Sequence, residues 1–237
     1  MGSIKMELIW GLLNNAAPLM LAGLGALLSD LSGALGIFIE GFMICGAFFS
    51  WVFTIWTGSA FLGTLISALL AALVGWALAR YAKVSGANPF IIGLAFNLAA
   101  SGLTLSLSAI WFGTKGVLLN PGIRIPAQST FTALALACII IAAIGLSRTV
   151  PGLRLKASGL APEAAADRGI RPWFYREGAW ALAAFLAALV FSFAERLGVN
   201  AQGLGGLPAT ALLGLPSALA LMLYSLSLWF KKRGVFK

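Results

Sequence analysis

The sequence predicts an all-α polytopic membrane protein, a bundle of about 6–7 transmembrane helices, and three observations support this fold class. Hydrophobic residues make up 60% of the 237 positions and charged residues only 10%, whereas soluble proteins average about 25% charged residues. Uncharged runs long enough to cross a hydrocarbon core of about 30 Å recur along the chain. The net charge of +9 resides mainly between and after these runs. We therefore expect one transmembrane domain over residues 1–237.

Seven apolar runs are the candidate spans, separated by polar breaks. They cover approximately 9–28, 35–56, 61–79, 89–112, 129–147, 178–194 and 209–230. An odd number of spans would place the N-terminus outside, and Lys5 argues against that placement. The polar break at 29–34 offers an alternative, because irregular backbone is allowed at membrane depth where protein buries it. We expect an N-terminus inside and one early element that is re-entrant or broken.

Residues 148–176 form the only long polar passage between apolar runs. They contain six of the sixteen Lys and Arg residues, and the tail after residue 230 contains four more. Because positive charge collects on the cytoplasmic side of membrane proteins, we expect this loop and the C-terminus to be cytoplasmic. Arg80 and Lys83 should lie on the same side if the intervening spans alternate.

A short helix is predicted inside this loop, at about 162–168. Pro162 is tolerated in a first helical turn, Glu163 lies near the positive end of the helix, and Ala164–Ala166 are strong helix formers. Gly169 can terminate the helix. A solvated loop would explain the charge alone, but a compact helix favours a docking role.

Two polar residues lie within apolar runs and are candidates for a translocation pathway. Glu40 is an ionisable residue in the second run, where such a group usually faces a cavity, a partner or the bundle interior. Asn97 lies in the fourth run. Each also has a structural interpretation, as a buried carboxylate with hydrogen-bond partners and as an interhelical hydrogen-bonding amide.

Several classes of function are disfavoured by what the sequence lacks. It has no Walker-type phosphate-binding motif and no histidine, so neither ATP binding of that kind nor a histidine-based catalytic or metal site is expected. Cys45 and Cys138 lie in apolar runs and are interpreted as small buried thiols. The basic charge fits membrane topology better than nucleic-acid binding. We expect no enzyme activity, catalytic residue, metal or cofactor in this chain.

Four passages resemble the permease subunits of bacterial ABC importers for branched-chain amino acids, ribose-type sugars and nucleosides. They are SDLSGALGIFIEGFM at 29–43, GANPFIIGLAFNLAASGLT at 86–104, LRLKASGLAPEAAADRGI at 153–170, and LPATALLGLPSALALMLYSL at 207–226. The third is the most specific and resembles the cytoplasmic coupling motif of the family. The second favours the nucleoside and simple-sugar subclass.

The resemblance implies a transport subunit with several partners. These would be ABC ATPase subunits that carry ATP and Mg²⁺, a second permease subunit (identical or different), membrane lipid and an extracytoplasmic substrate-binding lipoprotein, all at the bacterial plasma membrane. It implies contact with the ATPase through residues 160–170. The corresponding residues of this chain are Leu160, Ala161, Pro162, Glu163, Ala164, Ala165, Asp167, Arg168 and Gly169.

This sequence departs from the family pattern at several places. Asp30 replaces the usual Glu, Ile37–Ile39 lacks the usual Asn, and Ala161 replaces an Asn that would cap the coupling helix. Losing such a cap costs about 1 kcal/mol, so we expect this helix to be ordered only when its partner is bound. The region 177–207 is shorter than in the family, which suggests a partner-dependent subunit.

Two other classes of function are compatible with the sequence. A small secondary transporter or channel would use Glu40 as its proton- or ion-coupling carboxylate. A membrane scaffold would transport nothing. Copurification of an ATPase distinguishes the importer from both, and uptake that needs no ATPase but depends on pH and Glu40 would identify the secondary transporter.

Overall fold

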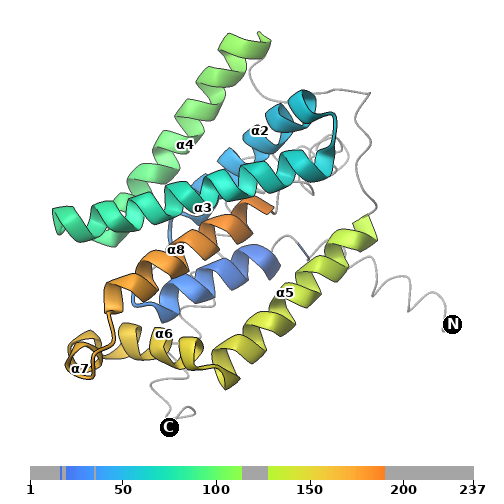
Figure 1. The fold of residues 1–237 in the computed structure, drawn as a ribbon. Coiled ribbons are helices and arrows are strands. Elements are labelled where there is room, and N and C mark those ends of the chain that lie inside the picture. The colour runs from blue at the N-terminus through green and yellow to red at the C-terminus, as the bar shows by residue number, and fades with distance from the viewer. Residues whose placement is uncertain (1–16, 18–19, 35, 114–127, 190–237) are drawn as a thin grey trace, which may run out of the picture.

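The computed structural model describes residues 17, 20–34, 36–113 and 128–189, and over these residues the chain forms helices joined by turns (Figure 1). The helices are Met20–Leu31, α2 (Ile39–Thr57), α3 (Ala60–Ser85), α4 (Pro89–Phe112), α5 (Gln128–Arg148), α6 (Val150–Leu160), α7 (Pro162–Asp167) and α8 (Pro172–Leu189). The all-α membrane fold is therefore confirmed.

Three of the described helices, α2, α3 and α4, are long and apolar enough to cross a membrane. A fourth candidate is the pair α5 and α6, which together meet the criterion but bend by 75° at their junction. The predicted spans at 61–79 and 89–112 correspond to α3 and α4. The run predicted at 35–56 begins later, at Ile39, and the last predicted span at 209–230 lies outside the described residues.

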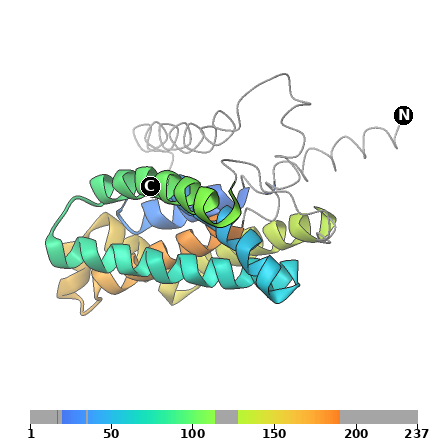
Figure 2. The same ribbon diagram turned by 90° about the horizontal axis from the view of Figure 1, so that it is seen from above.

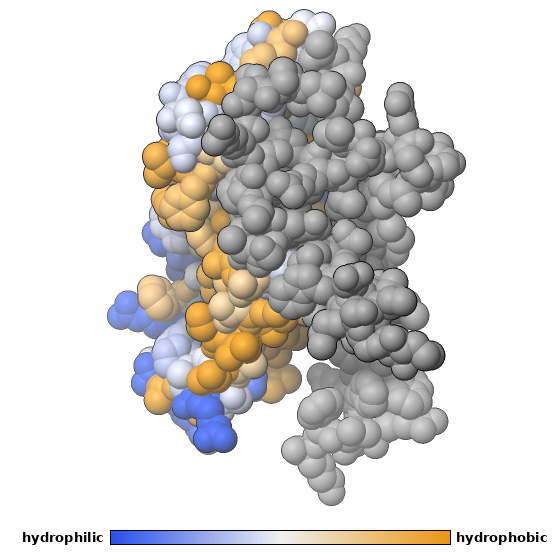
Figure 3. All heavy atoms as spheres, turned by 90° about the vertical axis from the view of Figure 1, so that its right-hand side faces the viewer, coloured by the Kyte–Doolittle hydropathy of each residue, from blue (hydrophilic) through white to orange (hydrophobic). Residues whose placement is uncertain are grey.

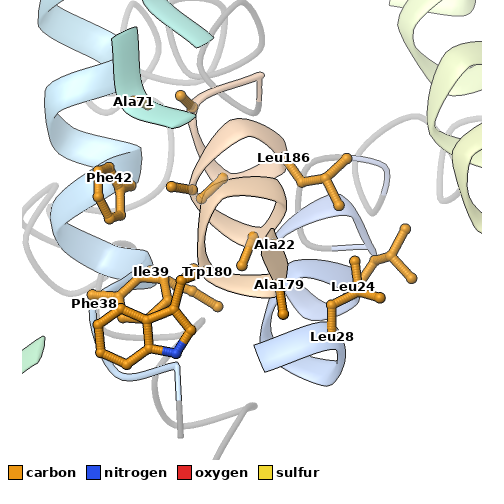
Figure 4. Packing of buried hydrophobic residues seen from close by; sticks show 14 of the residues in the cluster. Ala22, Leu24, Leu28, Phe38, Ile39, Phe42, Ala71, Ala179, Trp180 and Leu186 are labelled. Atoms are coloured by element: carbon orange, nitrogen blue, oxygen red, sulfur yellow. The ribbon is translucent and has the colours of Figure 1, made fainter. Parts of the chain in front are cut away.

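Helix α8 is the centre of the described bundle. Its residues Ala183, Ala184, Ala187 and Ala188 are fully buried. Figure 4 shows α8 between α2 and the helix Met20–Leu31, with Trp180 against Phe38. Small side chains allow this arrangement, because helices in a membrane gain their packing energy from close backbone approach.

The helix Met20–Leu31 runs antiparallel to α8. A Cβ on Gly25 would lie 2.9 Å from the carbonyl oxygen of Ala183, so the two backbones touch there. Toward the end of the same helix, the carbonyl of Ser32 accepts a hydrogen bond of 3.0 Å from Nε of Arg176. The helix therefore ends beside the first turn of α8.

Helix α2 runs in the opposite direction, parallel to α8. The rings of Phe38 and Trp180 lie 4.5 Å apart, and further along, a Cβ on Gly46 would lie 2.6 Å from Cα of Ala188. The chain thus reverses direction between two helices, and we call the described residues at this reversal, 32–34 and 36–38, the turn 32–38. The break predicted at 29–34 is a turn between antiparallel helices, and the first of them, Met20–Leu31, is shorter than a membrane span. The expectation of an early broken or re-entrant element stays a prediction. The side of the N-terminus stays a prediction.

Gly33 makes this reversal possible. Its φ of 82° is in the left-handed region that favours glycine. The N–H of Gly33 donates to the carbonyl of Asp30 and that of Ala34 to the carbonyl of Ser29, the pattern of a Schellman helix end. The hydroxyl of Ser29 donates to the carbonyl of Ala34 at 2.6 Å. The turn is therefore closed by its own backbone and by a buried serine.

The passage 148–176 is mostly helical, which corrects the prediction of a loop with one short helix. Thr149 begins α6 by accepting a hydrogen bond from the N–H of Gly152. Gly152, Leu155 and Ser158 are buried and recur at helical spacing, whereas of the charged residues between them Arg154 is exposed and Lys156 is half-buried. The charge of the passage suggested a loop, but its periodicity is that of an amphipathic helix.

The outer surface carries many exposed apolar side chains. Helix α4 lies at the margin of the described bundle and packs chiefly on α2 (Figures 1 and 2). Hydrophobic residues spread over much of the described surface in Figure 3. On α4 the exposed ones include Phe90, Ile91, Leu94, Leu98, Leu103 and Ile110. Such a surface is unusual for a soluble monomer and is suited to lipid or membrane partners.

Candidate coupling site

Helix α7 forms at the place predicted for the docking helix. Pro162 occupies its first turn, and the carbonyl of Ala161 accepts the first helical hydrogen bond from the N–H of Ala165, at 2.9 Å. Ala165 is buried, whereas Glu163 and Ala164 are exposed. One side of α7 therefore packs on the protein and the other is open to a partner.

The end of α7 is also as predicted. Gly169 has a φ of 78°, its N–H donates to the carbonyl of Ala166, and the N–H of Ile170 donates to the carbonyl of Ala165. These bonds form a Schellman motif. At the other end Ala161 has a non-helical backbone (φ −146°, ψ 76°) and provides no side-chain cap, so the prediction of an uncapped helix that begins at Pro162 is confirmed.

The structure gathers the nine predicted coupling residues into one projecting feature between α6 and α8 (Figure 1). Leu160 is 75% exposed. Leu160, Ala161, Glu163, Ala164, Asp167, Arg168 and Gly169 are exposed, Pro162 is half-buried, and Ala165 is buried. Contact of these residues with an ATPase stays a prediction.

An ion-pair cluster joins α3 to the start of α8 near this feature. Glu177 is buried, and its carboxylate oxygens lie 3.4 Å from Nζ of Lys83 and 3.7 Å from Nη1 of Arg80. Arg80 and Lys83 are thus at the same end of the bundle as α7, as predicted. Sequence reasoning missed Glu177, although an acidic residue at the start of an apolar helix could have been paired with these two bases.

Arg176 is a second residue that sequence reasoning missed. Its guanidinium lies 5.1 Å from the ring centroid of Trp173, within the range of a cation–π interaction. Its Nε donates to the carbonyl of Ser32. Nothing in the local sequence indicates a bond to a residue 144 positions away.

Asn97 holds the start of α2. Its Oδ1 accepts a hydrogen bond of 2.7 Å from the N–H of Gly41, and its Nδ2 donates one of 2.6 Å to the carbonyl of Ile37. Both groups belong to a helix start, where backbone groups lack helical partners. The structural interpretation of Asn97 as an interhelical hydrogen-bonding amide is confirmed.

Glu40 lies in the first turn of α2 and is half-buried. Glu40 therefore lies at the start of a candidate span, because the helix begins only one residue earlier. A negative charge at a helix N-terminus is favourable, which is a structural reason for this residue. Since Asn97 binds the next residue, Gly41, the two predicted pathway residues do lie together. Their role in a pathway stays a prediction.

Comparison with protein families identifies the class of the chain. A family model described as branched-chain amino acid transport system / permease component matches residues 8–194. The chain belongs to this permease family. It is therefore a multi-pass membrane protein of a transport system.

Curated proteins similar to this permease fall in the nucleoside and sugar group. It is 31% identical over 186 residues to a guanosine ABC transporter permease protein of Bacillus subtilis, covering 68% of this chain and 58% of the relative. It is 29% identical over 185 residues to a nucleoside ABC transporter permease protein of Lactococcus lactis, with the same coverage. A putative glucose ABC transporter permease protein of Haloferax volcanii is 29% identical over 192 residues, covering 72% of this chain and 58% of the relative.

The permease spans 58% of the length of each of these relatives. The family match ends at residue 194, just beyond the last described residue. The predicted shortening of 177–207 falls largely outside the described residues and stays a prediction. No solved structure matches the chain.

Proposed function

We propose that the chain is a permease subunit of an ATP-driven ABC importer for nucleosides or related small polar solutes such as sugars. Family membership and relatives named for guanosine, nucleosides and glucose support the class of substrate. The structural observation that carries the proposal is α7, a short, closed helix whose outer side is exposed. The chain carries the solute, and hydrolysis of Mg²⁺-bound ATP takes place in a partner ATPase.

The proposed ATPase docks on α7 from the cytoplasm. This places α7, the end of α3, the start of α8 and the C-terminus on the cytoplasmic side of the plasma membrane, in agreement with the clustering of positive charge. The remaining partners in the proposal are a second permease subunit within the membrane and a substrate-binding lipoprotein outside. The exposed apolar side chains of α4 suit lipid or such a subunit.

Force applied to α7 reaches the bundle through α8. Residues 168–171 link the two helices directly, and the alanines of α8 touch α2, α3 and the helix Met20–Leu31. A displacement of α7 therefore acts on the helix that has the most central position. ATP binding in the motor shifts the equilibrium between outward- and inward-open forms only as far as its affinity differs between them.

The test of docking is copurification of the ATPase with variants of the chain. Ala164 is exposed, so Ala164→Arg should abolish binding of the ATPase while leaving the permease folded. Ala165 is unsuitable, because it is buried and a large side chain would disturb packing. The matched control is Ser147→Arg, an exposed position at the end of α5. Undiminished binding by Ala164→Arg would refute docking on α7.

Transport assays separate the importer from a secondary transporter. Uptake of radiolabelled guanosine into proteoliposomes should require the ATPase and ATP. Uptake by Glu40→Gln should still require the ATPase and ATP and should gain no new dependence on pH. Uptake without any ATPase that responds to pH and is lost in Glu40→Gln would overturn the proposal.

A further inference from the structure

The last turn of α6, which directly precedes the coupling residues, touches the turn 32–38 through Gly33 and Gly159. A Cβ on Gly33 would lie 2.9 Å from Cα of Gly159 and 3.1 Å from Nη2 of Arg176. A Cβ on Gly159 would collide with the carbonyl oxygen of Leu31 and would lie 2.8 Å from the N–H nitrogen of Gly33. The last turn of α6, directly before α7, is thus in backbone contact with the reversal between the helix Met20–Leu31 and α2.

Arg176 closes the same junction from the side of α8. It donates from Nε to the carbonyl of Ser32, its Nη2 lies beside Gly33, and its guanidinium covers Trp173. A guanidinium at the C-terminal end of a helix is favourable, because that end carries partial negative charge. The side chain therefore has a fixed position between the start of α8 and the turn.

The far side of the turn is attached to the candidate pathway residues. Asn97 binds the carbonyl of Ile37 and the N–H of Gly41, and Glu40 lies between these two backbone groups. A movement of 32–36 relative to α4 must strain or reorient these bonds. The turn is thus held at one end by Gly159 and Arg176 and at the other by Asn97 of α4.

We infer that Arg176 is a positioning residue that, with the Gly33–Gly159 contact, transmits docking at α7 to the turn 32–38 and so to the first turn of α2. The inference rests on the proposed function, since it needs an ATPase that docks on α7. It goes beyond that function by identifying the turn 32–38 as the element that moves when the ATPase docks. Docking at α7 changes the exposure of the backbone around residues 30–41, which carries Glu40 and the partners of Asn97.

Hydrogen–deuterium exchange of the assembled importer in nanodiscs tests this inference. Peptides covering 160–169 report docking, and peptides covering 30–41 report its transmission. Binding of the ATPase should protect 160–169 and, in the same sample, change exchange in 30–41 by about fivefold or more, as expected for a coupled pair of sites. Protection of 160–169 with unchanged exchange in 30–41 would overturn the inference and leave the proposed function intact. Absence of protection at 160–169 would overturn both.

Variants of Arg176 test whether this side chain transmits docking to the turn 32–38. In Arg176→Gln the ATPase should still protect 160–169, but the response of 30–41 should be lost. Arg176→Lys, which keeps the charge and a donor, should retain part of the response. The matched control is Arg171→Gln, an exposed arginine in the same passage, which should respond like the unmodified protein. A full response in Arg176→Gln would refute the role of Arg176.

A second route to the same answer uses the glycine contact, in case Arg176→Gln does not fold. Gly159→Ala forces α6 away from Leu31 and should reduce the response of 30–41 while docking persists. Gly178→Ala is its control, because no described residue lies within 4 Å of the added methyl group. If exchange in 30–41 responds equally to the ATPase in both variants, the Gly33–Gly159 contact does not transmit docking.

Discussion

The side chain of Asn97 accepts a hydrogen bond of 2.7 Å from the backbone N–H of Gly41. The bond joins α4 to the first turn of α2, where helical geometry leaves the N–H without a partner in its own helix. The same amide donates to the carbonyl of Ile37, so one side chain satisfies two backbone groups. A leucine of similar size could satisfy neither.

Asn97→Leu should therefore lower the stability of the bundle. Leaving buried backbone groups unpaired costs about 1–3 kcal/mol, and thermal unfolding of the purified protein in detergent would show the loss. Ser101→Ala is the control one turn further along α4. Its exposed hydroxyl donates only within its own helix, to the carbonyl of Asn97, and the change should stay within about 0.5 kcal/mol. Equal unfolding temperatures of the two variants would contradict the role of Asn97.

Removing the charge of Glu177 should loosen α8 from α3. In Glu177→Gln the buried side chain loses its ionic attraction to Arg80 and Lys83, whose own side chains are 55% and 41% exposed. Because solvent screens both bases, we expect a loss of about 1 kcal/mol or less. The stability of the unmodified protein should fall with added salt and that of the variant should not. A salt dependence that is the same in both would disprove the ionic contribution.

Gly75→Ala should destabilise the protein by overpacking. The added methyl group would lie 2.6 Å from Cβ of Ala184 and 2.8 Å from the carbonyl oxygen of Trp180, and such crowding costs about 1–3 kcal/mol. Gly102→Ala on α4 is the control, since no described residue lies within 4 Å of its new methyl group. That change should be neutral or stabilising, by up to about 1 kcal/mol. Thermal unfolding of both variants measures the difference.

Restoring a cap at Ala161 should stabilise α7. Ala161→Asn supplies a side-chain acceptor at the start of the helix, where Asn contributes about 1 kcal/mol relative to Ala. Limited trypsin digestion at Arg168, which is exposed at the end of α7, should slow in this variant. Ala161→Gln is the control, because its longer side chain is a poor cap. Equal digestion rates in both variants would show that capping does not limit the order of α7.

The same digestion examines the predicted dependence of α7 on its partner. The trypsin sites at Arg154 and Lys156 fall in the passage 148–176, which the sequence predicts to be a loop, but both residues lie in α6. We now expect cleavage at Arg168 to precede cleavage at these two sites. If α7 is ordered only in the complex, the ATPase should protect Arg168. Equal protection with and without the ATPase would argue against that dependence.

Much of the fold could be predicted because local chemistry determines it. The ends of α7 follow from Pro162 and Gly169, and the spans α3 and α4 follow from long uncharged runs. The helix α6 was missed because its charges obscured a weak apolar periodicity. Glu40 was misplaced because the start of α2 has no side-chain cap to mark it.

The candidate coupling site divides in the same way. Its residues from Leu160 to Gly169 are contiguous, so short-range signals were sufficient to find them. Arg176, Glu177 and Gly159 act through partners that are 94 to 144 positions away or in a distant turn. Arg171 and Arg176 look alike in the sequence, because each is an arginine in the same polar passage. The sequence therefore could not show that Arg176 is the one that bonds to Ser32.

The amino-acid sequence alone determined that this chain lies in a membrane, that α3 and α4 are long apolar helices, and where a short docking helix begins and ends. These properties depend on hydrophobicity and on hydrogen bonds between near neighbours. The assembled bundle decided that α8 is central, that Asn97 holds the start of α2, and that Arg176 and Gly159 meet the turn beside Gly33. Such contacts depend on how closely small residues let separate helices approach. The distance between two helices is set by their packing and cannot be read from either helix alone.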